Sequence, residues 1–161
     1  AASDVYKRQV HTLLCGRCVR NRQYARRRIE GHIIESIENL LDPLQEAWSQ
    51  LCASKGIERD NLMISSGYRC YELNKRMKES STSAHTIGYA FDLLPANRLI
   101  MDFRKFCKDY LSDKPFDQLI SEQEDNSGIP SWIHIGYKDH QGRQHRRMLS
   151  MREERYYLWE E

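Results

Sequence analysis

The sequence contains no apolar run that approaches the roughly 18 consecutive residues needed to cross a membrane. Its first residues lack the apolar core of a secretory signal peptide, and neither internal repeats nor low-complexity tracts occur. A strong excess of one charge is also missing, because the net charge of +2 is too close to neutral to indicate nucleic-acid binding by itself. The 161 residues are 40% hydrophobic and 30% charged, which suits one compact domain with additional residues at its ends.

A regular cysteine framework is missing, because the five cysteines have no repeated spacing. An odd number without a framework indicates reduced thiols in a protein made in a cytoplasm. Cys15 and Cys18 have the spacing of half a zinc knuckle, but no second cysteine pair follows to complete four ligands. His11 and His32 could supply the two missing ligands of a four-ligand zinc site. We favour thiols that bind no metal.

The beginning of the chain has an unusual composition. An initiator Met is absent, and residues 1–9 resemble a translated sequencing adapter, so we leave them out of the functional interpretation. Residues 1–28 are treated as a basic N-terminal arm, in which a solvated arm is the favoured interpretation and contact with nucleic acid or teichoic acid is the alternative. Between positions 17 and 28 the arm carries no acid and six arginines: Arg17, Arg20, Arg22, Arg26, Arg27 and Arg28.

Hydrophobic periodicity predicts an α+β domain over residues 29–150, with a small antiparallel sheet and helices packed on one side of it. Pro43 should kink or divide the first helix. After Asp139 the chain is charged, and we interpret residues 151–161 as a C-terminal tail whose apolar end at 156–159 either docks or frays. The predicted helices cover 29–53, 70–77 and 97–111, and the predicted strands cover 61–65, 89–94, 116–122 and 131–137.

Three residues are candidates for a metal site. Asp92 lies in an apolar strand, where a buried carboxylate needs a cation, a set of donors or a metal. His85 precedes it at the exit of a loop, and His134 lies in another predicted strand. Two imidazoles and one carboxylate suit zinc and leave its fourth position open for water. For each residue taken alone a structural role is the favoured interpretation: His85 as a turn cap, Asp92 as a hydrogen-bond acceptor and His134 as a satisfied core histidine.

The stretch Ser66-Gly-Tyr-Arg69 follows a predicted strand and could direct Arg69 into the cleft, where a guanidinium would bind a substrate carboxylate or stabilise an oxyanion. The alternative is a surface arginine with Tyr68 in the core.

Taken together, these residues resemble the D-Ala-D-Ala carboxypeptidase-type zinc peptidases of the hedgehog/DD-peptidase fold, including short phage and bacterial murein peptidases. The resemblance covers roughly residues 30–150. It rests on Ser66-Gly-Tyr-Arg69 with Asn74, on Ser83-x-His85-x-x-Gly88-x-Ala90-x-Asp92 and on Trp132-x-His134.

The resemblance implies Zn²⁺ bound by His85, Asp92 and His134, and hydrolysis of peptide bonds next to D-amino acids in peptidoglycan. It also implies that Arg69 contacts the substrate or the transition state. Tyr68 and Ser83 are assigned to the same substrate-binding set, with Ser83 orienting its loop through a hydrogen bond.

The general base is the point at which the sequence departs from the family pattern. Many members carry an acid three residues before the last histidine, where this chain has Ser131. Glu122, at the end of the preceding strand, would reach the region beside His134 if the two strands form a hairpin, and we assign it as the base. Glu124 and Asp125 are alternatives in the loop.

The sequence therefore predicts a monomeric zinc metallopeptidase that acts on peptidoglycan as an endolysin or wall-remodelling enzyme. We expect no nucleic-acid partner, synthesis in the cytoplasm and release to the wall in the manner of a phage lysin. Endopeptidase, D,D-carboxypeptidase and L,D-carboxypeptidase activity all stay open. A non-catalytic wall-binding module that keeps the fold and the metal is the main alternative, and a nucleic-acid-binding protein that uses the basic arm is a third.

Overall fold

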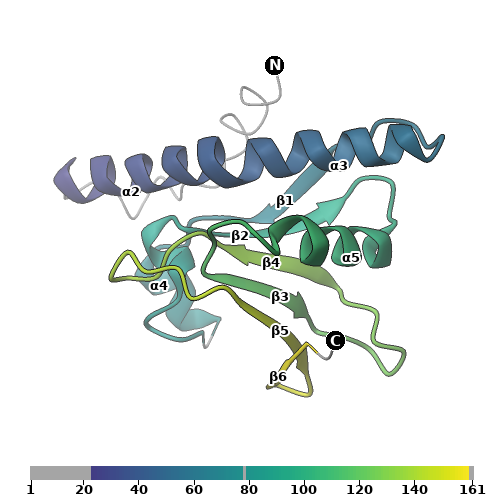
Figure 1. The fold of residues 1–161 in the computed structure, drawn as a ribbon. Helices are drawn as coiled ribbons and strands as arrows, with labels where there is room; N and C mark the ends of the chain where they lie inside the picture. Colours follow the sequence, from purple (N-terminus) through teal and green to yellow (C-terminus); the bar gives the residue numbers. More distant parts are fainter. Residues whose placement is uncertain (1–22, 78, 160–161) are drawn as a thin grey trace.

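The computed structural model describes residues 23–77 and 79–159. Its first feature is a long helical rod made of α2 (Gln23–Ser36), a π-helical turn η1 (Ile37–Leu41) and α3 (Asp42–Ser54), which continue into one another (Figure 1). The expected break at Pro43 is replaced by this wider turn, in which the Asp42 N–H donates to the Ile37 carbonyl five residues earlier. Pro43 lies in the first turn of α3, where its missing N–H costs least.

Six strands form one sheet in the order β1-β2-β4-β3-β5-β6, and all neighbours are antiparallel except β3 and β5. The predicted α+β class is confirmed. The remaining elements are β1 (Leu62–Ser66), α4 (Tyr71–Arg76), a short 3₁₀ turn η2 (Ala84–Ile87), β2 (Ala90–Pro95), α5 (Ile100–Leu111), β3 (Gln118–Glu122), β4 (Trp132–Gly136), β5 (Arg147–Arg152) and β6 (Arg155–Leu158).

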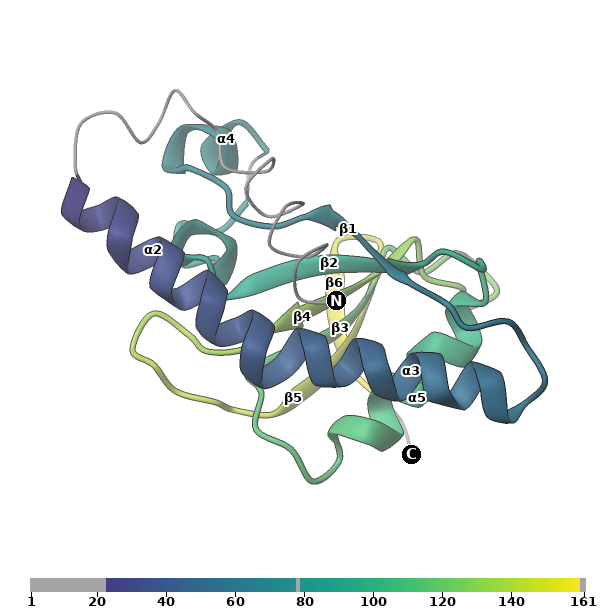
Figure 2. The same ribbon diagram turned by 90° about the horizontal axis from the view of Figure 1, so that it is seen from above.

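The two faces of the sheet differ in character. On one face Phe91 pairs with Ile135 and Leu93 with Ile133, all fully buried. The long helices pack there, and Trp48 of α3 meets the Phe103 ring of α5 at 5.2 Å between centroids. The short helix α4 lies on the opposite side of the sheet (Figure 2). Because side chains alternate along a strand, the residues between the core positions project to this second face.

The C-terminal hairpin extends the sheet beyond the expected boundary at residue 150. We interpreted residues 151–161 as a tail, but residues 155–158 form β6 and pair with β5. The two strands are joined by Glu153 and Glu154, which both have positive φ angles, 47° and 60°. Hairpin turns of this kind favour Asn and Gly. Two glutamates gave no turn signal, so the hairpin could not be read from the sequence.

Several sequence features lie outside the described residues or have no structural consequence within them. Cys15, Cys18 and the arm up to residue 22 lie outside them, while the last three arginines of the arm are exposed at the start of α2. Cys52, Cys70 and Cys107 are buried free thiols. In the part of the chain that the structure describes, no helix is both long and apolar enough to span a membrane.

Gly88 connects the η2 turn to β2 and provides a test of the packing. Its φ is +83°, and an added Cβ would lie 2.9 Å from the Ile33 Cγ1. We expect Gly88→Ala to lower the free energy of unfolding by about 1–3 kcal/mol through strain and overpacking. Gly31→Ala is the matched control, since nothing lies within 4 Å of its Cβ, and it should stabilise α2 by up to about 1 kcal/mol. Urea unfolding measures both, and equal effects would contradict the packing.

Candidate metal centre

Two of the three predicted ligands come from neighbouring strands. Asp92 of β2 and His134 of β4 are direct partners in the antiparallel register. Both project to the sheet face that lies away from α3 and α5. The third, His85, is supplied by η2, and Gly88 then turns the chain into β2. All three side chains are buried, at 2%, 3% and 8% exposure for His85, Asp92 and His134.

The ligand atoms form a small triangle. The His134 Nδ1 lies 3.0 Å from the Asp92 Oδ1 and 3.1 Å from the His85 Nε2. The remaining side, from the His85 Nε2 to the Asp92 Oδ1, is 3.3 Å. Ligand atoms about 2.0–2.1 Å from a tetrahedral zinc ion lie roughly 3.3 Å apart. The three predicted residues therefore converge on one point with spacings that suit a single ion.

Neighbouring groups hold two ligands in orientation. The His85 Nδ1 is 2.8 Å from the Gly67 carbonyl oxygen, so this nitrogen carries the proton and the Nε2 keeps its lone pair for a metal. The second carboxylate oxygen of Asp92 accepts a hydrogen bond from the Arg69 Nη2 at 2.6 Å. Arg69 is itself held by its Nε–H, which donates to the Ser66 hydroxyl at 2.9 Å.

The electrostatics favour a cation at this point. Burial raises the pKa of Asp92, but the His134 and His85 rings, whose nitrogens lie within 3.3 Å of its Oδ1, outweigh it, so the pKa lies well below its usual value. Burial lowers the pKa of His85. The site therefore offers a carboxylate and a neutral imidazole at neutral pH, which are the protonation states that bind a metal.

Arg69 and Ser83 have contacts that differ from those expected. Two nitrogens of Arg69 are engaged by Asp92 and Ser66, and its Nη1 lies 3.8 Å from Glu79. Arg69 thus positions a ligand, and its contact with substrate stays a prediction. Ser83 uses its carbonyl oxygen, which accepts hydrogen bonds from Thr86 and His140, and its hydroxyl makes no capping bond. Tyr68 is buried in the core cluster, as the alternative interpretation had it.

The three candidate bases lie in different surroundings, because β3 ends at Glu122 and Gln123, with a φ of 47°, turns the chain before the other two. Glu122 pairs with Trp132 at the end of β3, on the same face as Asp92 and His134. Glu124 points to the other face, where its Oε1 accepts from Arg104 and its Oε2 is 2.9 Å from the Arg152 Nε. Asp125 caps its own loop by accepting the N–H groups of residues 127 and 129. Only Glu122 of these three faces the metal centre.

Glu122 is poised to exchange a proton near neutrality. Burial raises its pKa to about 7, and the negative charges of Asp92 and Glu79 add to this while His134 and Arg69 oppose it. A carboxyl with a pKa near the working pH is suited to general acid–base catalysis. Glu122 differs in its pKa from Asp92, whose pKa lies well below the usual value.

Tyr156 is a residue of this face that the sequence did not reveal. It pairs with Met151 at the sheet edge, on the face that carries Glu122. Burial raises the pKa of Tyr156, and the charges of Glu122, Glu79 and Asp92 raise it further. Its hydroxyl therefore stays protonated and can donate a hydrogen bond close to the negative charges of the site. Only recognition of the β5–β6 hairpin would have placed it here.

Comparison with known proteins agrees with this geometry. A sequence profile described as Peptidase M15 matches residues 25–135, more than half of the chain. This chain belongs to the M15 peptidase family. No curated protein matches it. M15 peptidases are typically zinc-dependent, and the His-Asp-His group of this chain lies within the matched residues.

The ligand assignment makes a direct prediction. Purified protein should contain about one zinc per chain, and His134→Ala or Asp92→Asn should lower the zinc content to a small fraction, because two ligands cannot hold the ion tightly. His140→Ala is the control, as this exposed histidine contacts only Ser83 and Thr86 among the described residues. Elemental analysis after dialysis measures the content, and full zinc in the ligand variants would contradict the site.

The pKa of Glu122 predicts a pH-dependent stability in the metal-free protein. Its folded pKa of about 7 exceeds the ordinary 4.5, so the folded state retains a proton that the unfolded chain loses first. Stability should therefore fall as the pH rises from about 4.5 to 7. Glu122→Gln should remove this loss, raising the melting temperature at pH 8 relative to wild type and changing it little at pH 4. A variant equally stabilised at both pH values would refute the assignment.

Proposed function

We propose that this M15 peptidase hydrolyses peptide bonds in the stem peptides or cross-links of bacterial peptidoglycan with a zinc ion bound by His85, Asp92 and His134. The observation that carries the proposal is the convergence of these ligands on one point, with Glu122 on the same sheet face. Three protein ligands leave a coordination position open, which is the arrangement of catalytic rather than structural zinc sites.

The residues around the site have distinct roles in this proposal. A zinc ion there would supply Lewis acidity toward the scissile carbonyl and would lower the pKa of water. Glu122 accepts the proton of the attacking water and passes it to the leaving amine, a transfer for which a pKa of about 7 is well matched. Arg69 holds Asp92 in place through its 2.6 Å hydrogen bond, and its positive charge favours a negatively charged substrate group or oxyanion nearby.

Peptidoglycan as the substrate is supported by the motifs that the chain shares with murein peptidases. On the sheet face that carries the metal centre, Tyr156 of β6 is exposed and offers an aromatic surface to a polymer. We further propose that the protein acts as a monomer on the cell wall after synthesis in the cytoplasm.

A non-catalytic wall-binding module is the second candidate. It is favoured by one observation, namely that the position three residues before His134 is Ser131, whose hydroxyl donates to the Gln123 carbonyl at 3.3 Å. Such a module would keep the metal and bind the wall without cutting it.

Replacement of Glu122 discriminates between the two candidates. Glu122→Gln should retain zinc and lower kcat on purified sacculi by about 10²–10⁴-fold, because the transfer of a proton is lost. Asp125→Asn is the control, because the sequence alone could not exclude Asp125 as the general base. This variant should keep near wild-type activity. Mass spectrometry of released muropeptides is the measurement, and it also identifies the bond that is cut. Absence of any product from the zinc-loaded wild type would favour the binding module.

A further inference from the structure

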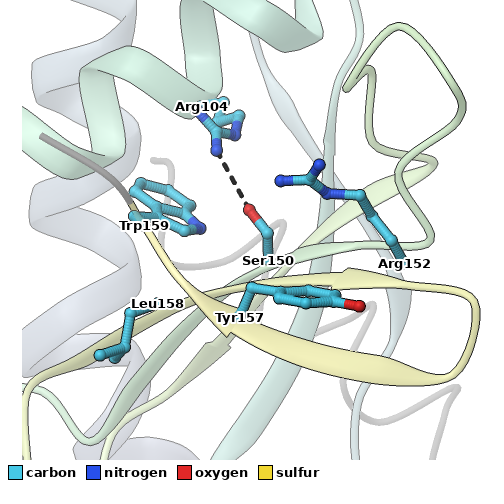
Figure 3. Close-up of a pocket in the computed structure, with 6 residues that line it drawn as sticks. All are labelled: Arg104, Ser150, Arg152, Tyr157, Leu158 and Trp159. Carbon is cyan, nitrogen blue, oxygen red and sulfur yellow. Dashed lines mark hydrogen bonds between the residues drawn. The ribbon is translucent and has the colours of Figure 1, made fainter.

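A pocket lies on the face of the sheet opposite the metal centre, between α5 and the C-terminal hairpin (Figure 3). Its volume is about 450 Å³. Ser150 and Tyr157 are partners in the β5–β6 register, and their side chains project to the face that carries α5. The pocket is therefore separated from the metal centre by the thickness of the sheet. Its lining consists of Arg104, Ser150, Arg152, Tyr157, Leu158 and Trp159.

Two arginines in this pocket share one carboxylate. Glu124 is 9% exposed, and its two oxygens are divided between them: Oε1 lies 3.3 Å from the Arg104 Nη2, and Oε2 lies 2.9 Å from the Arg152 Nε. Two guanidinium groups facing one acid leave an excess positive charge. Among the described residues, the Nη1 of Arg104 and both terminal nitrogens of Arg152 have no acceptor, and a guanidinium nitrogen can only donate a hydrogen bond.

The rest of the lining adds hydroxyl groups, an indole N–H and aromatic surface, and no carboxylate. The Ser150 hydroxyl already donates to the Glu124 Oε1 at 2.7 Å. The Arg104 guanidinium lies 4.2 Å above the Trp159 ring, which fixes both groups. The indole Nε1–H of Trp159 is buried without an acceptor in the described part of the chain and faces the Ser150 side of the pocket in Figure 3. A buried donor without a partner costs free energy that an incoming acceptor would recover.

We propose that this pocket binds an oxyanion, a phosphate or a carboxylate, carried by the cell-wall polymer. The excess guanidinium charge and the unpaired N–H donors favour such a group over a neutral or cationic one. The pocket is larger than a free phosphate needs, and the Trp159 and Tyr157 rings provide surface for the sugar or peptide that carries the anion. The identity of the polymer rests on the proposed function, whereas binding of the anion does not. The site would retain the enzyme on the wall while the opposite face acts on a stem peptide.

The first test is calorimetric titration of the zinc-loaded protein with inorganic phosphate. We expect saturable binding that Arg152→Gln weakens about tenfold, since it removes charge-assisted hydrogen bonds. Trp159→Phe keeps a ring, removes the N–H and should also weaken binding. Arg155→Gln is the matched control, because Arg155 lies on β6 outside the lining. It should change affinity by less than about twofold.

Two outcomes would overturn the proposal that the pocket binds an anion. One is phosphate binding that Arg152→Gln and Arg155→Gln affect equally, which would indicate diffuse charge. The other is the absence of binding in wild type. Zinc content and cleavage of a soluble muropeptide should be unchanged in Arg152→Gln, which shows that the metal centre is intact.

The second test identifies the source of the anion with sedimented sacculi and full-length protein carrying Glu122→Gln to prevent digestion. The part of the binding that Arg152→Gln removes should disappear after hydrofluoric acid treatment if wall phosphodiesters are bound, and after carbodiimide amidation if carboxylates are bound. Sacculus binding that never depends on Arg152 would overturn the role on the wall. If the wild-type protein binds phosphate but does not cleave sacculi, only the proposed function is refuted and the anion site stands.

Discussion

The pairing of β2 with β4 is the interaction on which both the core and the metal centre depend. In one antiparallel register, Phe91 and Leu93 meet Ile135 and Ile133 on the helix side, while Asp92 meets His134 on the other. A slip of one residue would exchange the faces, burying the carboxylate against α3 and α5 and exposing the apolar side chains. The hydrophobic free energy of the core therefore also holds two metal ligands within 3.0 Å of each other.

The carboxylates of the site are given different proton affinities by their surroundings. Asp92 accepts a hydrogen bond from Arg69 and lies beside the rings of His85 and His134, and it stays ionised although it is buried. Glu122 is buried with no such donor among residues 23–77 and 79–159, and its pKa is raised to about 7. Two acids on one sheet face thereby have different proton affinities, which is the pattern expected of a site that uses one acid as a metal ligand and the other as a proton carrier.

The C-terminal hairpin gives each face of the sheet an additional set of groups. Along β6, Tyr156 projects to the sheet face that carries Glu122. The adjacent Tyr157 lines the pocket that contains Arg104 and Arg152 on the helix side. Because side chains alternate between the two faces of a strand, neighbouring residues of β6 face the metal centre on one side of the sheet and the positively charged pocket on the other. Glu122 ends β3 and Glu124 lies just beyond it, and the two carboxylates are divided between the two sites because the chain bends at Gln123.

The sequence by itself determined the local elements and the composition of the metal site. Periodicity placed the helices and the four strands around the ligands within a few residues, because alternation and helical spacing are local properties. The resemblance to zinc peptidases singled out His85, Asp92 and His134 before their 3.0–3.3 Å triangle was known. Only the tertiary structure decided what depends on pairing between distant segments. The Arg69 bond to Asp92, the choice of Glu122 over Glu124, the hairpin turn through Glu153 and Glu154, and the pocket beneath Trp159 all depend on register and pleat, which bring together residues that no local pattern connects.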